Sequence, residues 1–330
     1  MLALAVRGDL SVGLEEVEQP AFADGQVLVQ LKAAALNRRD QWIREGKYPG
    51  IKSGSILGSD GAGEVVAVGR KADEQWLGKS VIINPNIDWG SNPQVQSRDY
   101  QILGMPSNGT LAHFVVVGVD RLVKKPDHLS YVQAAALPLA GLTAYRALHN
   151  YIKIDHGVRV FLSGFGGGVA QFVFLFARAL QLDVFVSSGN DSNLQHAESL
   201  GAIKGFNYNH KEWVKELIAF TKGVELIIDS AGGNQFNQLI KALKPGGKIV
   251  FYGATNGLPE KIDLFNLFWK QCSIQGTSMG NDREFIQMLE LVTKQNIEPI
   301  IGSVRPFEEV MTAMDEMKSG RLFGKSVLTF

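Results

Sequence analysis

The chain has 330 residues, of which 45% are hydrophobic, and 33 basic side chains balance 33 acidic ones. At about 100–200 residues per domain, this length predicts two domains, and the balanced charge argues against nucleic acid or an anionic membrane as a partner. The one cysteine, Cys272, excludes an intramolecular disulfide and a zinc site built from clustered thiolates. The longest apolar stretch, residues 169–180, is shorter than the ~20 residues of a membrane span. We therefore expect a cytoplasmic protein.

The first 123 residues have the pattern of short strands separated by turn residues. Residues 26–32 alternate between polar and apolar side chains, which is the period of a strand with one buried face. Further apolar runs follow, with glycine and proline between them. Regular short strands of this kind are typical of an antiparallel barrel or sandwich. These further runs are residues 64–68, 79–83 and 112–117.

After residue 125 the pattern changes to strands that alternate with helices. Such alternation predicts βαβ units, and hence a doubly wound α/β fold with helices on both faces of a parallel sheet. Beyond about residue 266 we expect one more helix and a final apolar strand. The expected strands are residues 158–162, 184–186, 225–229, 248–252 and 326–330, and the expected helices are residues 169–180, 193–200, 213–221, 235–243 and 283–293.

A glycine-rich loop lies between the strand at 158–162 and the following apolar helix, which is the context of a dinucleotide-binding loop. Gly164 can form the tight turn. Gly167 and Gly168 allow backbone N–H groups to approach a pyrophosphate, and Val169 continues into the helix whose positive end the phosphate would meet. Ala170 is small enough for close packing of helix and strand. The loop therefore predicts a dinucleotide site.

The end of the second strand indicates which dinucleotide binds. NAD sites place an acidic residue there, because a carboxylate accepts a hydrogen bond from the ribose 2′-hydroxyl. This chain has Ser187 and Ser188 instead, so no carboxylate would repel a 2′-phosphate, and NADP(H) is favoured. The alternative is that Asp183 or Asp191 provides the carboxylate.

Over nearly its whole length the chain resembles the medium-chain dehydrogenase/reductase superfamily, and within it the zinc-free quinone oxidoreductases. No single motif is decisive, but the order and spacing of the motifs are specific. The resemblance is carried by residues 35–40, 46–48, 57–65, 137–145, 229–233 and 246–250, together with the glycine loop.

The resemblance implies an α/β protein with two domains. A GroES-like β-barrel catalytic domain would comprise residues 1–123 and 266–330, and a Rossmann domain that binds NADP(H) would comprise residues 124–265. It also implies a homodimer in which the parallel sheets meet edge to edge.

The chain departs from the zinc-dependent alcohol dehydrogenases of the same superfamily. Their catalytic zinc ligands, Cys, His-Glu and Cys, fall here on Asn37, Ser59-Asp60 and Ala140, and the lobe of their structural zinc falls on residues 85–105, which contain no cysteine. We therefore expect no bound metal. Yet residues 100–104 and 108–117 are more similar to the zinc-type relatives, which indicates a zinc-type lineage that lost both metals.

The resemblance also assigns site residues. Asn37 and Tyr48 would orient the oxygen of the hydride acceptor, and a proton would come from Tyr48 or from water. Thr143 and the turn of Tyr252, Gly253 and Ala254 would hold the nicotinamide and its ribose. In NADP-binding relatives a lysine and a tyrosine contact the 2′-phosphate; these positions hold Asn193 and Tyr208.

The function expected from these residues is transfer of hydride from NADPH to a quinone or an α,β-unsaturated carbonyl compound without a metal. The sequence also allows two alternative functions. One is an alcohol or aldehyde dehydrogenase with a metal-free proton relay, and the other is a non-catalytic NADPH-binding protein, since relatives of this branch serve as lens crystallins.

Overall fold

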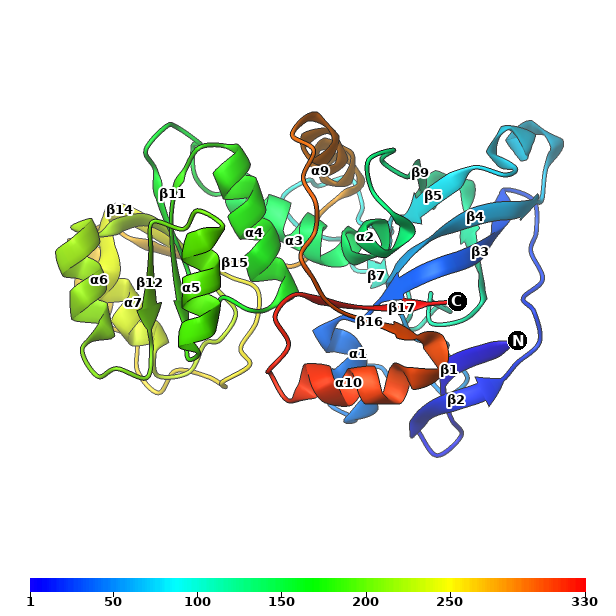
Figure 1. Ribbon diagram of the computed structural model, residues 1–330, viewed down its shortest axis with the longest axis horizontal. Helices are drawn as coiled ribbons and strands as arrows, with labels where there is room; N and C mark the ends of the chain where they lie inside the picture. The colour runs from blue at the N-terminus through cyan, green and yellow to red at the C-terminus, as the bar shows by residue number, and fades with distance from the viewer. The chain divides into compact units, whose positions relative to one another are not determined.

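The computed structural model describes residues 1–330, apart from the side chain of Ala72. The chain forms two compact units, each of which is described by itself (Figure 1). The first unit consists of Met1–Leu142 and Gly280–Phe330, and the second consists of Thr143–Met279. No helix in the described part of the chain is both long and apolar enough to cross a bilayer.

The first unit is built on a seven-stranded sheet with the order β16-β17-β3-β4-β5-β9, in which β8 pairs with β3. All of its pairs are antiparallel except β16 with β17. The sheet encloses an apolar core because alternate residues of β3, such as Val27, Val29 and Leu31, point inward. These findings confirm the expected barrel. The strands of the sheet are β3 (Gln26–Ala35), β4 (Asp60–Val68), β5 (Ser80–Ile83), β8 (Phe114–Gly118), β9 (Leu122–Lys124), β16 (Ile301–Pro306) and β17 (Lys325–Thr329).

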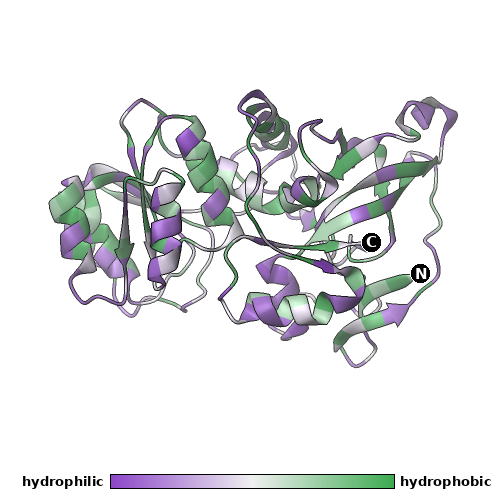
Figure 2. Cartoon of the chain, in the orientation of Figure 1, coloured by the Kyte–Doolittle hydropathy of each residue, from purple (hydrophilic) through white to green (hydrophobic). Residues whose placement is uncertain are grey.

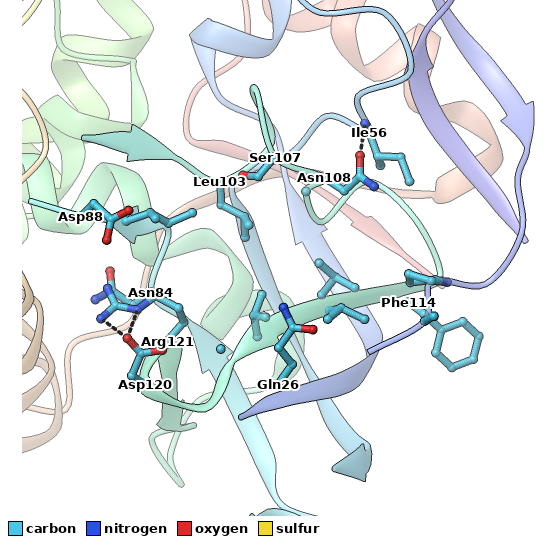
Figure 3. Close-up of a pocket in the computed structure, with 18 residues that line it drawn as sticks. Gln26, Ile56, Asn84, Asp88, Leu103, Ser107, Asn108, Phe114, Asp120 and Arg121 are labelled. Atoms are coloured by element: carbon cyan, nitrogen blue, oxygen red, sulfur yellow. Dashed lines mark hydrogen bonds and ion pairs between the residues drawn. The ribbon is translucent and has the colours of Figure 1, made fainter. Parts of the chain in front are cut away.

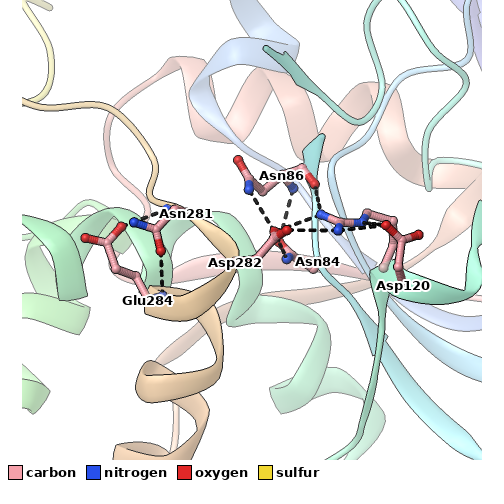
Figure 4. A network of polar contacts seen from close by, with 7 residues as sticks. Asn84, Asn86, Asp120, Asn281, Asp282 and Glu284 are labelled. Carbon is pink, nitrogen blue, oxygen red and sulfur yellow. Dashed lines mark hydrogen bonds and ion pairs between the residues drawn. The ribbon is translucent and has the colours of Figure 1, made fainter. Parts of the chain in front are cut away.

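Short hairpins and helices complete the first unit. The hairpins pair β1 with β2 and β6 with β7. Helix α9 begins at a polar network that joins it to the lobe after β5 (Figure 4). There Asp282 accepts hydrogen bonds from Arg121, Asn84 and Asn86 at 2.8–2.9 Å. The elements are β1 (Leu2–Val6), β2 (Val12–Glu16), β6 (Asn86–Ile87), β7 (Gln101–Ile102), α1 (Arg38–Arg44), α2 (Tyr131–Ala136), α9 (Asp282–Lys294), α10 (Val310–Lys318), η1 (Lys71–Trp76), η2 (Val119–Arg121) and η3 (Phe307–Glu309). Helix α3 (Pro138–His149) begins in this unit and continues into the second.

The second unit contains a six-stranded parallel sheet with the order β12-β11-β10-β13-β14-β15. This is the strand order of a dinucleotide-binding Rossmann fold, and the order reverses between β10 and β13. The expected doubly wound sheet is thus confirmed. In Figure 2 hydrophobic residues follow its strands, and helix α5 carries hydrophilic residues. The elements are β10 (Arg159–Leu162), β11 (Asp183–Ser188), β12 (Lys204–Asn207), β13 (Val224–Asp229), β14 (Leu243–Phe251), β15 (Ser273–Gly276), α4 (Gly168–Ala179), α5 (Asp191–Ser199), α6 (Trp213–Thr221), α7 (Phe236–Ala242) and α8 (Leu264–Trp269).

The two units divide later in the chain than the boundaries expected at residues 123 and 266. Helix α2 follows the first boundary, yet it packs against β3, β4 and β17 and belongs to the barrel unit. Strand β15 follows the second boundary, yet it pairs with β14 and completes the parallel sheet. Periodicity marked the change from strands to helices, whereas packing decides to which unit each helix and strand belongs.

Candidate functional site

Asn37 lies where β3 ends and α1 begins. The backbone N–H of Asn37 donates to Asp40 Oδ2 at 2.8 Å, so the side chain of Asp40 fixes the first turn of α1. The carboxamide of Asn37 points elsewhere, toward Asp60 at the start of β4 and Lys325 at the start of β17. These three side chains are nearly or fully buried, with 6%, 0% and 4% of their residue surface exposed.

Lys325 uses all three hydrogens of its ammonium within this cluster. Its Nζ donates to the carbonyl oxygen of Leu36 and to Asn37 Oδ1, both at 2.8 Å, and to Asp60 Oδ2 at 3.0 Å. Asp60 accepts further hydrogen bonds from Asn37 Nδ2 at 2.9 Å and from the N–H of Leu139 at 2.8 Å. The buried charges are therefore paired and hydrogen-bonded, as buried charges must be.

These contacts leave only one orientation for the carboxamide of Asn37. An ammonium only donates hydrogen bonds and an ionised carboxylate only accepts them. Hence Oδ1 must face Lys325 and Nδ2 must face Asp60. One of the two Nδ2 hydrogens is bound by Asp60.

Lys325 was not among the residues expected at the site. It lies 288 positions from Asn37 in sequence and reaches it because β17 pairs antiparallel with β3, with Val327 opposite Ala35. The sequence did contain a signal, since a lysine directly precedes the apolar run of the last strand. A buried lysine is rare unless it is paired.

Tyr48 joins the same region through Arg39. The Arg39 Nε donates to Tyr48 Oη at 3.3 Å, and its guanidinium lies 4.9 Å from the centre of the tyrosine ring. The other end of the guanidinium donates from Nη1 to Ser59 Oγ at 2.6 Å and to the carbonyl of Leu103 at 2.7 Å. Because Ser59 directly precedes Asp60, Arg39 connects Tyr48 with the cluster around Asn37. Sequence reasoning did not find Arg39 either.

Asp40 is a fully buried carboxyl group beside this cluster. Burial raises its pKa to about 6, and this effect outweighs the opposing influence of Arg39, of the Asn37 N–H and of Lys325. Asp60 adds to the rise by charge repulsion. In the described part of the chain, Asp40 Oδ1 is buried without a hydrogen-bond partner. The carboxyl group therefore favours its protonated form below about pH 6.

We expect this carboxyl group to make the protein more stable as the pH falls from 8 to 5. The pKa of about 6 in the folded chain exceeds the value of about 3.9 in an unfolded chain, so folding favours proton uptake. The free energy of unfolding should gain about 1.4 kcal/mol from this group over that range, and Asp40→Asn should lack the gain. Urea unfolding at several pH values measures it. Equal pH slopes for the native chain and Asp40→Asn would contradict the prediction.

The glycine loop leads into a helix N-terminus that has no side-chain cap. Gly164 has a φ of +67°, a left-handed conformation that favours glycine. Gly167 precedes α4, no side chain caps this end of the helix, and a Cβ at Gly167 would meet nothing within 4 Å. Gly168 and Val169 form the first turn of α4. The backbone N–H groups of this turn can therefore receive an anion.

The residues expected around a 2′-phosphate divide into two groups. Ser187 is buried, and its Oγ accepts a hydrogen bond from the N–H of Gly164 at 3.3 Å, so this hydroxyl supports the glycine loop. Ser188, Asn193 and Tyr208 lie together instead. Asn193 Nδ2 is 3.5 Å from Ser188 Oγ, and the N–H of Tyr208 donates to the Ser188 carbonyl at 3.2 Å.

A carboxylate also lies near this group. Asp191 Oδ1 accepts a hydrogen bond from Asn207 Nδ2 at 2.6 Å, and Asn207 directly precedes Tyr208. Of the two carboxylates that the sequence offers as alternatives, Asp191 therefore lies nearer to Ser188. Asp183 lies at the opposite, amino end of β11.

Of the residues expected to hold the nicotinamide, three follow the carboxyl end of β14 and Thr143 lies on α3. Tyr252, Gly253 and Ala254 follow β14, and the N–H of Tyr252 donates to the carbonyl of Asp229 at 3.1 Å. Burial raises the pKa of Tyr252 to about 12, so its phenol stays protonated at neutral pH. Thr143 is buried on α3, with its Oγ1 3.9 Å from Met279 Sδ. Ligands of such sheets bind at this edge.

A separate cavity of about 390 Å³ lies in the first unit, between β8 and the loop at 103–109 (Figure 3). Its polar lining includes Gln26, Asn84, Asn108 and Arg121. None of the residues expected at the site lines it in the part of the chain that the structure describes.

Known proteins resemble the chain over its whole length. Residues 23–127 match the alcohol dehydrogenase GroES-like domain family, and residues 168–294 match the zinc-binding dehydrogenase family. The zinc-type alcohol dehydrogenase-like protein YogA of Leptosphaeria maculans is 35% identical, over 96% of this chain and 93% of the relative. A crotonyl-CoA carboxylase/reductase of Cereibacter sphaeroides is 25% identical, over 94% of this chain and 81% of the relative. The crystal structure of an NAD-dependent alcohol dehydrogenase superposes with a TM-score of 0.92 at 31% identity, and both chains are covered completely.

The zinc implied by these family names does not fit the residues of this chain. Zinc sites in proteins use cysteine, histidine and carboxylate ligands, usually four for a structural site and three for a catalytic one. Asn37, Ser59, Asp60 and Ala140 provide a single carboxylate, and its Oδ2 already accepts a hydrogen bond from the Lys325 ammonium. In the described residues no group of three or more histidine, cysteine or acidic side chains is placed to hold a metal ion.

Proposed function

Because the chain belongs to the medium-chain dehydrogenase/reductase superfamily, we propose that it is an NADPH-dependent oxidoreductase whose hydride acceptor is a quinone or an α,β-unsaturated carbonyl compound. The observation that carries the proposal is the cluster of Asn37, Asp60 and Lys325, which fixes the carboxamide of Asn37 and contains a single carboxylate as a possible metal ligand. The glycine loop and the carboxyl edge of the parallel sheet support binding of the dinucleotide, which supplies the hydride.

The chemistry of the reaction favours reduction of a conjugated carbonyl compound over oxidation of a simple alcohol. Removing the proton of an alcohol, whose pKa is about 16, is difficult without a Lewis acid such as zinc. Hydride addition to an enone or quinone instead gives an enolate or phenolate, in which conjugation spreads the negative charge. Hydrogen-bond donors suffice for such a charge, and Asn37 provides one.

In this proposal Asn37 donates its second Nδ2 hydrogen to the acceptor oxygen. Tyr48 accepts a hydrogen bond from Arg39, so its own hydroxyl hydrogen can bind the same oxygen. The acceptor gains a hydride and then a proton, which comes from Tyr48 or from water. Thr143 and the turn at 252–254 would bind the nicotinamide and its ribose.

The experiment that tests the function is NADPH oxidation by the purified protein with quinones, enones and aldehydes, and NADP⁺ reduction with alcohols. We expect the quinones or enones to give the highest kcat/KM. A metal-free alcohol dehydrogenase is the second candidate, favoured by the alcohol dehydrogenase relatives. Faster turnover of primary alcohols would establish it and overturn the proposal.

We expect the purified protein to contain no stoichiometric zinc and to keep its activity in chelators. The donor set around Asn37 has too few ligands, and the Lys325 ammonium would repel a second cation. Mass spectrometry of metals and assays after EDTA treatment measure both properties. One zinc per chain, with activity lost on chelation, would contradict this expectation.

A homodimer through the second unit is also part of the proposal. Strand β15 forms one edge of the parallel sheet, and α8 beside it in sequence buries none of its residues. Phe265, Phe268 and Trp269 of α8 are each more than 60% exposed. An exposed apolar patch next to an open sheet edge is typical of an interface. The aromatic run at 264–269 thus fits a subunit contact better than a core.

We expect the native chain to sediment at twice the mass of one chain and the double variant Phe265→Glu/Trp269→Glu to sediment as a monomer. Carboxylates in this patch would be buried without partners on association. Ile203→Glu serves as the control, because Ile203 is exposed beside β12 at the opposite edge of the sheet. A native monomer, or a double variant that still dimerises, would contradict the expectation.

A further inference from the structure

The ion pair of Lys325 and Asp60 places two opposite charges on the carboxamide of Asn37. Lys325 Nζ lies 2.8 Å from Asn37 Oδ1, and Asp60 Oδ2 lies 2.9 Å from Asn37 Nδ2. Both charged residues are almost completely buried. A buried ion pair often adds less stability than apolar side chains of the same volume. Stability alone therefore does not account for a lysine at this position.

The two charges have opposite effects on any negative charge that develops beside Asn37. The ammonium attracts such a charge and the carboxylate repels it, and the low dielectric of a buried site strengthens both effects. With both residues present the two effects oppose each other. With Asp60 alone the site would carry a net negative charge and would oppose the formation of an enolate or phenolate.

We propose that Lys325 is a positioning residue, which fixes the carboxamide of Asn37 and neutralises Asp60 so that negative charge can form on the acceptor oxygen. The inference rests on the proposed function for the identity of that oxygen. In this role the ammonium of Lys325 acts through its contacts with Asn37 and Asp60, without contacting the substrate.

The test compares Lys325→Met with Asp60→Asn, because each variant leaves one buried charge without its partner. Both should therefore lower the Tm to a similar extent, by roughly 6–20 °C. Their effects on kcat with an enone should be opposite. Lys325→Met should lower kcat by about 10- to 100-fold, and Asp60→Asn should raise it by about 3- to 10-fold. A purely structural role would lower kcat in both.

A second measurement gives a result without turnover. The anion of 4-nitrophenol is a stable phenolate, so its absorbance change on binding to the protein–NADP⁺ complex reports the affinity for an oxyanion. We expect Lys325→Met to weaken this binding by about tenfold and Asp60→Asn to strengthen it by about threefold. If Lys325→Met does not fold, Lys325→Gln takes its place with the same expected direction.

The outcomes separate the inference from the proposed function. A native enzyme that reduces no quinone or enone overturns the proposed function, whereas phenolate binding by the two variants still decides the role of Lys325. If both variants lose kcat and phenolate affinity equally, Lys325 is structural and the inference is wrong. A loss of phenolate affinity in Asp60→Asn alone would also overturn it.

Discussion

Asn37→Ala is expected to lower kcat with a quinone or enone by about 100- to 1000-fold, while the affinity for NADPH stays the same. The variant removes the amide that, in the proposed function, donates to the acceptor oxygen, and loss of an oxyanion donor typically has an effect of this size. Steady-state kinetics measure kcat, and fluorescence titration measures the Kd of NADPH. Both measurements are needed because a misfolded site would weaken NADPH binding as well.

Tyr48→Phe is the matched comparison for Asn37→Ala, since it removes a second donor while it retains the ring under Arg39. We expect a smaller loss in kcat, about 10- to 100-fold, because water can replace a tyrosine hydroxyl that is half-buried. Full activity in Tyr48→Phe would remove Tyr48 from its proposed role but leave the reaction class intact. Full activity in Asn37→Ala would contradict the proposed site.

Most of the fold could be predicted from the sequence, because the local periodicity of apolar residues determines most of its strands and helices. The alternation in residues 26–32 predicted β3, and the apolar helix after the glycine loop predicted α4 with nearly its observed bounds. The short strands β12 and β15 were missed because each contains a single large apolar side chain among small and polar ones. Their place at the two edges of the sheet comes from pairing with a neighbour.

The candidate site could be predicted only in part, because some of its contacts join segments that are distant in sequence. Asn37 and Tyr48 were assigned to the site because motifs of the family contain them, and their roles stay predictions. Lys325 and Arg39 were missed because their roles depend on contacts between distant segments, such as that of β17 with the end of β3. Ser187 shows the same limit in the second unit. Its position in sequence suggests a ribose contact, whereas its hydroxyl binds the glycine loop.

The neighbourhood of Ser188 explains why we expect only a modest preference for NADPH over NADH in the native enzyme. Ser188, Asn193 and Tyr208 offer hydrogen bonds but no positive charge, and Asp191 lies close by. Hydrogen bonds without a cation should favour NADPH by roughly 1–3 kcal/mol. This preference sets the baseline against which a variant at Ser188 is measured.

Ser188→Asp is expected to invert that preference, so that NADH binds more tightly than NADPH. The new carboxylate would repel the 2′-phosphate of NADPH and could accept a hydrogen bond from the 2′-hydroxyl of NADH. We expect the Kd of NADPH to rise by about 1000-fold, which exceeds the native preference, and that of NADH to change by less than about threefold. Ser188→Asn is the control, since asparagine has the size of aspartate without its charge. It should weaken the binding of NADPH and NADH by the same factor. Equal losses for both nucleotides in Ser188→Asp would show that the 2′-phosphate does not bind at Ser188.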